Sequence, residues 1–299
     1  DTAPSSPRLA QLLQSIDVGS VADDFSGTVT AASLDSQADS AVFVDSNNRA
    51  YVISTKGDGY FQSFTPAEVK ISDVRPDVAA GRIFAAEQNG RILRWRLDSP
   101  RLAPSEECAL DERVSGLDVV RNGQRLYMGT ESGDIVRRDL RLGRIVRVCT
   151  LPSSVSRLAV SGGGKWVLAA TLHGGIYAVE TAGDGNPLKL DEISPEPVAV
   201  QLDGESGVAA VVDANDLMRV FSIRQSFTAG TVDPAVDDIR SIAIGPSHQI
   251  FCLSVDEPSL RVWRIRQEKI SRDVPGIDEV RPDEDGSGTE RQFGEGRGA

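Results

Sequence analysis

The chain has 299 residues, of which 40% are hydrophobic and 25% are charged, so it holds enough apolar side chains to bury a sizeable core. Its formal net charge of -12 excludes a broad surface for duplex nucleic acid, because phosphate contacts need clustered Lys and Arg. The longest apolar runs, such as residues 207–212, fall far below the roughly 20 residues that a membrane-spanning helix needs. We therefore expect a protein with no membrane span and no nucleic-acid partner.

Residues 1–27 form the first segment, in which residues 6–16 predict a short helix. Ser6 fits its N-cap and Pro7 its first turn, where a missing N–H costs little. Its apolar residues recur at helical spacing on one face: Leu9, Leu12, Leu13 and Ile16. That face needs a partner, which is either the rest of this chain or another subunit. Residues 17–25 predict a strand that pairs with the last repeat.

Residues 28–274 carry an internal repeat. One pattern, a turn followed by a strand with an anchor residue, returns six times. The anchors are Ile53, Trp95, Arg138, Val179, Phe221 and Trp263. They are separated by 42, 43, 41, 42 and 42 residues, a regular period that indicates a repeat architecture.

Each repeat predicts four short strands. In the third repeat these are residues 114–120, 125–130, 135–140 and 145–151, all rich in Val, Ile, Leu or aromatic residues and separated by turn residues. Gly and Asp interrupt the pattern too often for helix pairs. We therefore predict an all-β propeller with six recognisable four-stranded blades, in which the second strand, the most apolar, lies buried between neighbouring blades.

Two repeats resemble blades of the WD-repeat family. They are the sixth, "SIAIGPSHQIFCLSVDEPSLRVWRI", and the third, which ends in Asp139-Leu140 where that family usually has Trp-Asp-Leu. Ser254, Asp256 and Trp263 match the polar network of the family in one blade, whereas its usual Gly-His pair is absent. Residues 42–55 and 125–135 resemble quinoprotein-like or lactonase-like propellers equally well.

The C-terminal end leaves the number of blades open between six, which we favour, and seven. The sequence of residues 274–283 is similar to the first strand of the third repeat. It follows the preceding anchor, Trp263, at a shorter interval than the corresponding strand of that repeat does. Residues 275–299 are predicted to be a flexible acidic and Gly-rich tail, with "DEDGSG" at 283–288 matching only the start of a calcium loop.

No motif in the sequence supports catalysis. The two histidines, His173 and His248, fall in turns of different repeats, and no hydrolase-elbow, zincin or phosphate-loop motif occurs. The cysteines lie singly on predicted strands, which favours small buried residues in a reducing intracellular compartment: Cys108, Cys149 and Cys252. We expect no catalytic residue, no cofactor and no metal.

Arginines crowd the outer strands of repeats two and three. The candidate contacts for an acidic partner are Arg94, Arg96, Arg137, Arg138 and Arg141, together with Leu9, Leu12, Leu13 and Ile16 of the predicted helix. The alternative for the arginines is ion pairing with Asp98, Asp134 and Asp139.

The sequence favours a non-catalytic propeller scaffold that binds other protein subunits in a larger assembly, with no sign of a homo-oligomer. One alternative is a small-ligand- or metal-binding propeller enzyme of lactonase or quinoprotein-like type. Another is an open ring that a partner's strand completes.

Overall fold

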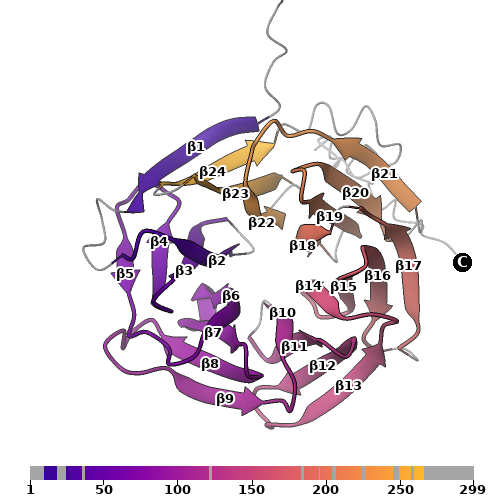
Figure 1. Ribbon diagram of the computed structural model, residues 1–299, viewed down its shortest axis with the longest axis horizontal. Coiled ribbons are helices and arrows are strands. Elements are labelled where there is room, and N and C mark those ends of the chain that lie inside the picture. Colours follow the sequence, from indigo (N-terminus) through magenta and orange to yellow (C-terminus); the bar gives the residue numbers. More distant parts are fainter. Residues whose placement is uncertain are drawn as a thin grey trace, which may run out of the picture.

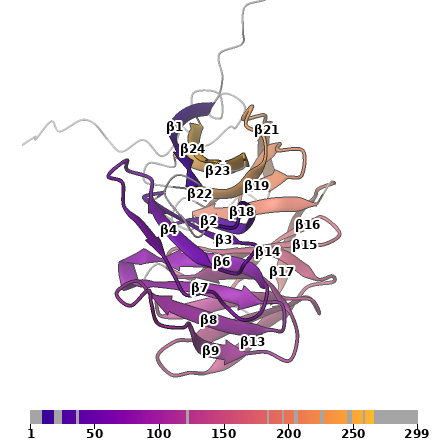
Figure 2. The same ribbon diagram turned by 60° about the vertical axis from the view of Figure 1, so that its left-hand side comes forward.

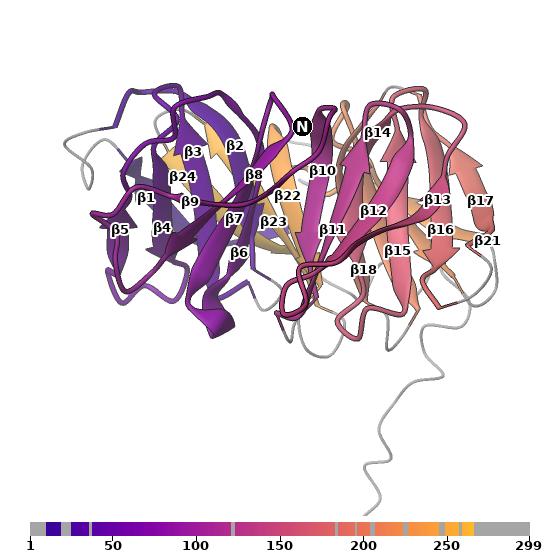
Figure 3. The same cartoon turned by 90° about the horizontal axis from the view of Figure 1, so that it is seen from below.

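The computed structural model describes residues 10–18, 25–35, 38–120, 123–182, 185–194, 196–203, 207–223, 227–244, 249–256 and 259–265. Its strands form six four-stranded antiparallel sheets arranged radially around one axis (Figure 1). Seen from the side, the sheets stand next to one another as the blades of a ring (Figure 3). The all-β propeller and its six blades are therefore confirmed, while residues 274–283 lie outside the described residues.

Strands of the same rank recur in every blade, from the axis outwards. The innermost strands are β2 (Val29–Leu34), β6 (Ile71–Asp77), β10 (Val114–Val119), β14 (Val155–Val160), β18 (Pro197–Asp203) and β22 (Ile239–Ile244). The second strands are β3 (Ser40–Asp45), β7 (Arg82–Glu87), β11 (Arg125–Thr130), β15 (Trp166–Thr171), β19 (Val208–Asp213) and β23 (Ile250–Asp256).

The two outer ranks follow. The third strands are β4 (Ala50–Ser54), β8 (Arg91–Arg96), β12 (Asp134–Asp139), β16 (Gly175–Glu180), β20 (Met218–Ser222) and β24 (Ser259–Ile265). The outermost strands are β5 (Phe61–Ser63), β9 (Ser105–Ala109), β13 (Ile145–Thr150), β17 (Pro187–Glu192), β21 (Phe227–Val232) and β1 (Ala10–Asp17). The described residues also contain a three-residue 3-10 helix, η1 (Val78–Ala80), and no helix long and apolar enough to cross a bilayer.

We number the blades in chain order of their innermost strands, from blade 1 with β2 to blade 6 with β22. The core consists of a hydrophobic cluster at each junction between neighbouring blades. Strand β3 shows how one strand serves two of them: Ala41 and Phe43 pack toward blade 6, and Val42 and Val44 pack toward blade 2. Successive side chains of a strand point to opposite faces, so a strand between two sheets must be apolar at every position. This explains the continuous apolar runs of the second strands.

The anchors occupy equivalent places in five blades but not in the sixth. Trp95 pairs with Ile83 of the second strand, and in blade 6 the residue at the matching register is Ile265, not Trp263. The hairpin between β23 and β24 is longer than its counterparts, because pairing there continues to Asp256 and Ser259. Assigning Trp263 to the anchor position was therefore wrong: Ile265 is buried, whereas Trp263 is only partly buried.

The predicted N-terminal helix is also wrong, because residues 10–17 form β1, the outermost strand of the last blade. Figures 1 and 2 both show β1 along β24, and the two pair antiparallel from Ala10 opposite Ile265 to Asp17 opposite Ser259. Hydrogen bonding to the open edge of β24 outweighs the local helical spacing of the leucines. The chain closes its own ring, so no partner strand is needed.

The closing strand supplies the first prediction. Deleting residues 1–17 should unfold or aggregate the protein, because β24 becomes an exposed edge and the outermost strand of blade 6 is lost. Circular dichroism melting and size-exclusion chromatography measure this outcome. A Leu12→Ser variant, which changes an exposed side chain of β1, should melt within a few degrees of the wild type, and an equally stable deletion variant would contradict the proposed role of β1.

Candidate functional site

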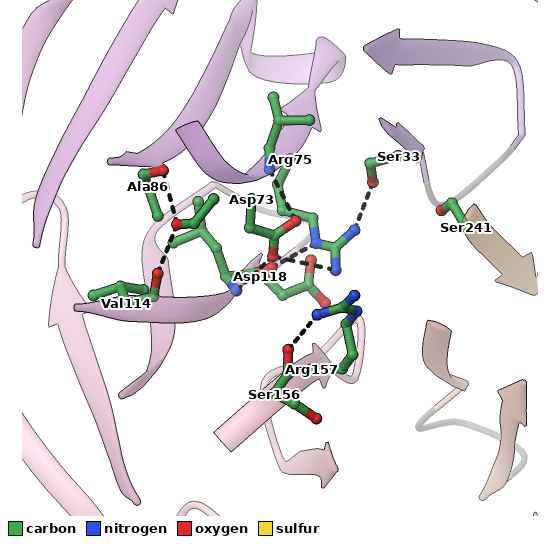
Figure 4. A network of polar contacts seen from close by, with 12 residues as sticks. Ser33, Asp73, Arg75, Ala86, Val114, Asp118, Ser156, Arg157 and Ser241 are labelled. Carbon is green, nitrogen blue, oxygen red and sulfur yellow. Dashed lines mark hydrogen bonds and ion pairs between the residues drawn. The ribbon is translucent and has the colours of Figure 1, made fainter. Parts of the chain in front are cut away.

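The six innermost strands line a central channel, and they share one irregularity. In each of them the pairing register with the second strand shifts after the first pair, as between Ile71 and Asp73 in β6. The residue after this shift and the residue two positions later lie on the same face of the strand. In blades 2 and 3 these positions bring Asp73, Arg75 and Asp118 into the channel (Figure 4).

Two carboxylates join neighbouring blades through backbone amides. Asp73 accepts hydrogen bonds from the N–H groups of Val74 and Leu117, each at 2.9 Å. Asp118 accepts from Val119 at 2.9 Å and from Val160 of blade 4 at 2.7 Å. Each carboxylate thus satisfies one amide of its own strand and one amide of the next blade.

Arg75 connects three blades. Its Nε donates to the carbonyl oxygen of Leu117 in blade 3 at 2.5 Å, and its Nη1 donates to Ser33 Oγ in blade 1 at 2.7 Å. Its Nη2 lies 3.6 Å from Asp73 Oδ2. A planar guanidinium with five donors suits this task, because it can reach several acceptors in fixed directions.

The other junctions carry comparable links. Arg157 Nε donates to the carbonyl oxygen of Val198 in blade 5 at 2.8 Å, and Leu34 N–H donates to Ser241 Oγ in blade 6 at 3.1 Å. Asp216 of blade 5 accepts from the amides of Asp238 and Ile239 at 2.9 Å each. Polar contacts therefore tie every blade to its neighbour.

Asp118 has the most perturbed carboxyl of the channel. Burial raises its pKa to about 6, although the charge of Arg75 and the amides of Val160 and Val119 favour the ionised form. The negative charge of Asp73 repels that of Asp118 and so raises the pKa of Asp118 further. The group is thus poised to gain or lose a proton slightly below neutral pH.

The channel contains two cavities separated by Arg75, which lines both. The wider one, of about 200 Å³, lies toward the ends of the innermost strands and includes Asp35, Asp77 and Asp118. The narrower one, of about 90 Å³, lies toward the beginnings of these strands and includes Arg157 and Arg240. Each is large enough for a few waters or a small ion.

On the outer rim, Arg94 and Arg138 share one carboxylate. Both bind Glu107 of β9 at 3.0 Å, and Arg138 comes from the next blade. Arg138 occupies the anchor position that is apolar in the other blades, with a side chain only 15% exposed, and Glu107 is 7% exposed. The pair therefore replaces an apolar contact between blades 2 and 3.

Some of the other arginines on this rim form ion pairs with acidic residues, and others do not. Arg96 pairs with Asp98 at 2.7 Å and Arg147 with Asp134 at 3.3 Å, as the ion-pair alternative predicts. Asp139 instead accepts the backbone amide of Arg141 at 2.9 Å. Among the described residues, the side chains of Arg137 and Arg141 form no ion pair.

The predicted apolar face of the N-terminal segment is dispersed along β1. Leu12 and Leu13 are exposed on that strand, whereas Ile16 packs against the cluster between blades 6 and 1. Leu9 lies outside the described residues.

Beside the unpaired arginines lies an exposed apolar edge that the sequence did not single out. Leu142, Ile145 and Val146 are 60%, 42% and 45% exposed, at the start of β13 and in the turn before it. Three other outermost strands protect their edges: β5 has three residues, β9 carries two glutamates, and β17 begins with Pro187 and is charged. The outermost strand β1 exposes Leu12 and Leu13 instead. Blade 3 therefore presents an apolar edge with arginines on either side.

The thiols and the described histidine lie apart from the channel. Burial raises the pKa of Cys108 and Cys149 to about 11, and Cys252 is also buried with a raised pKa. All three cysteines are free, and His173 is exposed in the turn between β15 and β16, whereas His248 lies outside the described residues. The part of the chain that the structure describes holds no group of three or more His, Cys, Asp or Glu side chains suited to a metal ion.

Comparison with known proteins identifies a fold but no family. No family model and no curated protein matches the sequence. Among solved structures, the chain is similar to the β-propeller domain of Cps50 (Swd1) from Myceliophteria thermophila, with a TM-score of 0.60 and 9% identity over 79% of this chain and 82% of that one. At that identity the likeness supports the propeller fold alone.

The sequence did not single out the channel residues, although it contains a signal for them. Arg75, Asp118 and Arg157 are charged residues that stand next to Val or Leu within short innermost strands. Aligning the six repeats on these strands would have placed Ser33, Arg75 and Asp118 at one position.

The raised pKa of Asp118 supplies the second prediction. Its unfolded pKa is about 3.9 and its folded pKa about 6, so the folded state binds the extra proton between these values and stability falls as the pH rises through them. Relative to Asp118→Asn, the wild type should lose about 2 kcal/mol of unfolding free energy between pH 4 and pH 6.5. Urea titrations measure this difference, and parallel curves for the two proteins would contradict it.

The shared carboxylate supplies the third prediction. Glu107→Gln should lower the free energy of unfolding by about 3 kcal/mol, because it leaves the largely buried Arg138 without a counter-charge. The matched control is Asp98→Asn, which removes an ion pair whose two side chains are each 64% exposed and should cost less than about 1 kcal/mol. Equal losses of unfolding free energy in the two variants would show that the buried Glu107 contact stabilises the protein no more than the exposed Asp98 ion pair.

Proposed function

We propose that this protein is a non-catalytic propeller scaffold that binds an acidic partner protein through the outer edge of blade 3. The observation that carries the proposal is the exposed apolar group of Leu142, Ile145 and Val146 beside unpaired arginines. Exposed apolar residues grouped on an outermost strand, together with Arg, favour a protein interface. Only the closed ring makes this edge rigid enough to serve as a platform.

The charge of the edge indicates the kind of partner. Arg141 and Arg144 are exposed at the turn before β13, and neither side chain forms an ion pair among the described residues. On a chain with a net charge of -12, a local basic edge favours a segment with acidic residues next to apolar ones. The outward backbone groups of β13 can also receive an extended segment of the partner.

We further infer that the repeats are degenerate WD repeats. Trp263 Nε1 donates to Ser254 Oγ at 2.9 Å, the contact that the resemblance in the sixth repeat predicted. In the other blades the equivalent second-strand positions carry Asp45, Glu87, Thr130, Thr171 and Asp213. These polar residues are buried at the same place, which supports descent of the blades from one repeat.

Affinity purification from cells that make the protein tests the proposed edge, with quantitative mass spectrometry as the readout. A protein that binds the wild type in stoichiometric amounts should be retained at least about tenfold less by the Leu142→Glu/Ile145→Glu variant, because buried apolar anchors dominate interface energies. Arg141→Glu/Arg144→Glu should weaken binding and reduce its salt dependence.

The control for this experiment is Leu188→Glu, which places one negative charge on the exposed outermost strand of blade 4. All variants should melt like the wild type. Retention of the same proteins by every variant, or a wild type that purifies alone, would rule out a docking role for the blade 3 edge.

A further inference from the structure

The narrower cavity of the channel is lined by more positive than negative charge. Three arginines from three blades line it, Arg75, Arg157 and Arg240, against the single acidic residue Asp73. Figure 4 shows Arg75 and Arg157 pointing into the channel from different strands. On a protein with a net charge of -12, such a concentration of arginine at one end of a channel requires an explanation.

The three arginines differ in how far nearby acidic groups compensate their charge. Arg75 is neutralised by Asp73 and held by Ser33 and Leu117. Among the described residues, Arg157 donates to neutral carbonyl oxygens alone, those of Val198 and Ser156 at 2.8 and 2.7 Å. These two hydrogen bonds fix its orientation and leave its charge uncompensated.

Arg240 is the most available of the three. Its side chain is exposed and forms no hydrogen bond or ion pair among the described residues. Ser241, the next residue, is 4% exposed and lines the same cavity. Its Oγ accepts the Leu34 amide, so the hydroxyl hydrogen is free to donate.

We propose that this mouth of the channel binds a phosphate group, with Arg157 and Arg240 matching its two negative charges and Ser241 donating a hydrogen bond. Arginine forks and hydroxyl donors are the groups that proteins use for phosphate oxygens. The cavity of about 90 Å³ suits an ion of this size, and Arg75 lines it together with Arg157 and Arg240. This site is separate from the edge of blade 3, so either proposal can fail without the other.

Isothermal titration calorimetry with inorganic phosphate in a low-salt, phosphate-free buffer tests the site. The wild type should bind one phosphate, and Arg240→Gln should weaken that binding at least about tenfold, because one charge-assisted contact is lost. The Arg240 side chain forms no hydrogen bond or ion pair within the part of the chain that the structure describes, so the variant should fold normally. Acetate, with a single charge, should bind more weakly than phosphate.

The matched control is Arg261→Gln in the same blade, which makes an equal change in charge at an arginine paired with Asp256 outside the channel. It should leave phosphate binding unchanged. Phenyl phosphate distinguishes the source of the group: equal affinity indicates a phosphate carried by a larger molecule, and loss of binding indicates the free ion. A wild type that binds no phosphate up to about 10 mM, or equal affinity in Arg240→Gln, overturns the proposal.

Discussion

The pairing of β1 with β24 is the constraint on which the remaining structure depends. Each blade of a propeller is stable because its two faces are buried by its neighbours, and the first and last blades meet only if the ring closes. Here the chain joins its two ends within one sheet, so separating them requires breaking a run of main-chain hydrogen bonds. The cluster between blades 6 and 1, with Val18, Phe43 and Leu253, forms under that condition.

Closure also creates the channel and its polar links. Burying Asp73, Arg75 and Asp118 removes part of their favourable solvation free energy. Their contacts with amides, carbonyls and one another offset this loss. For Asp118 the compensation is incomplete, since its pKa remains raised. These links join different blades, whereas the hydrogen bond between Trp263 and Ser254 lies within blade 6. The protein thus combines apolar packing between blades with polar ties near the axis.

The rim of blades 2 and 3 shows how one substitution within a repeat alters a surface. Arg138 stands where the other blades have an apolar anchor, and Glu107 and Arg94 accompany it as a buried charged group. The arginines that remain unpaired lie farther out, next to Leu142 and Ile145. Burial therefore separates the arginines that hold blades together from those that are exposed to solvent.

The sequence by itself determined the propeller, its strand ranks and its period, because alternating or continuous apolar runs and turn residues are local signals that recur in every blade. Only the tertiary structure showed that residues 10–17 form a strand. Their leucines fit a helix locally, and their strand partner lies about 250 residues away. The tertiary structure also placed Ile265 at the anchor of blade 6, because hairpin length sets register. Arg75, Asp118 and Arg157 line one channel only in the folded ring, because charges on separate strands meet only after the ring closes.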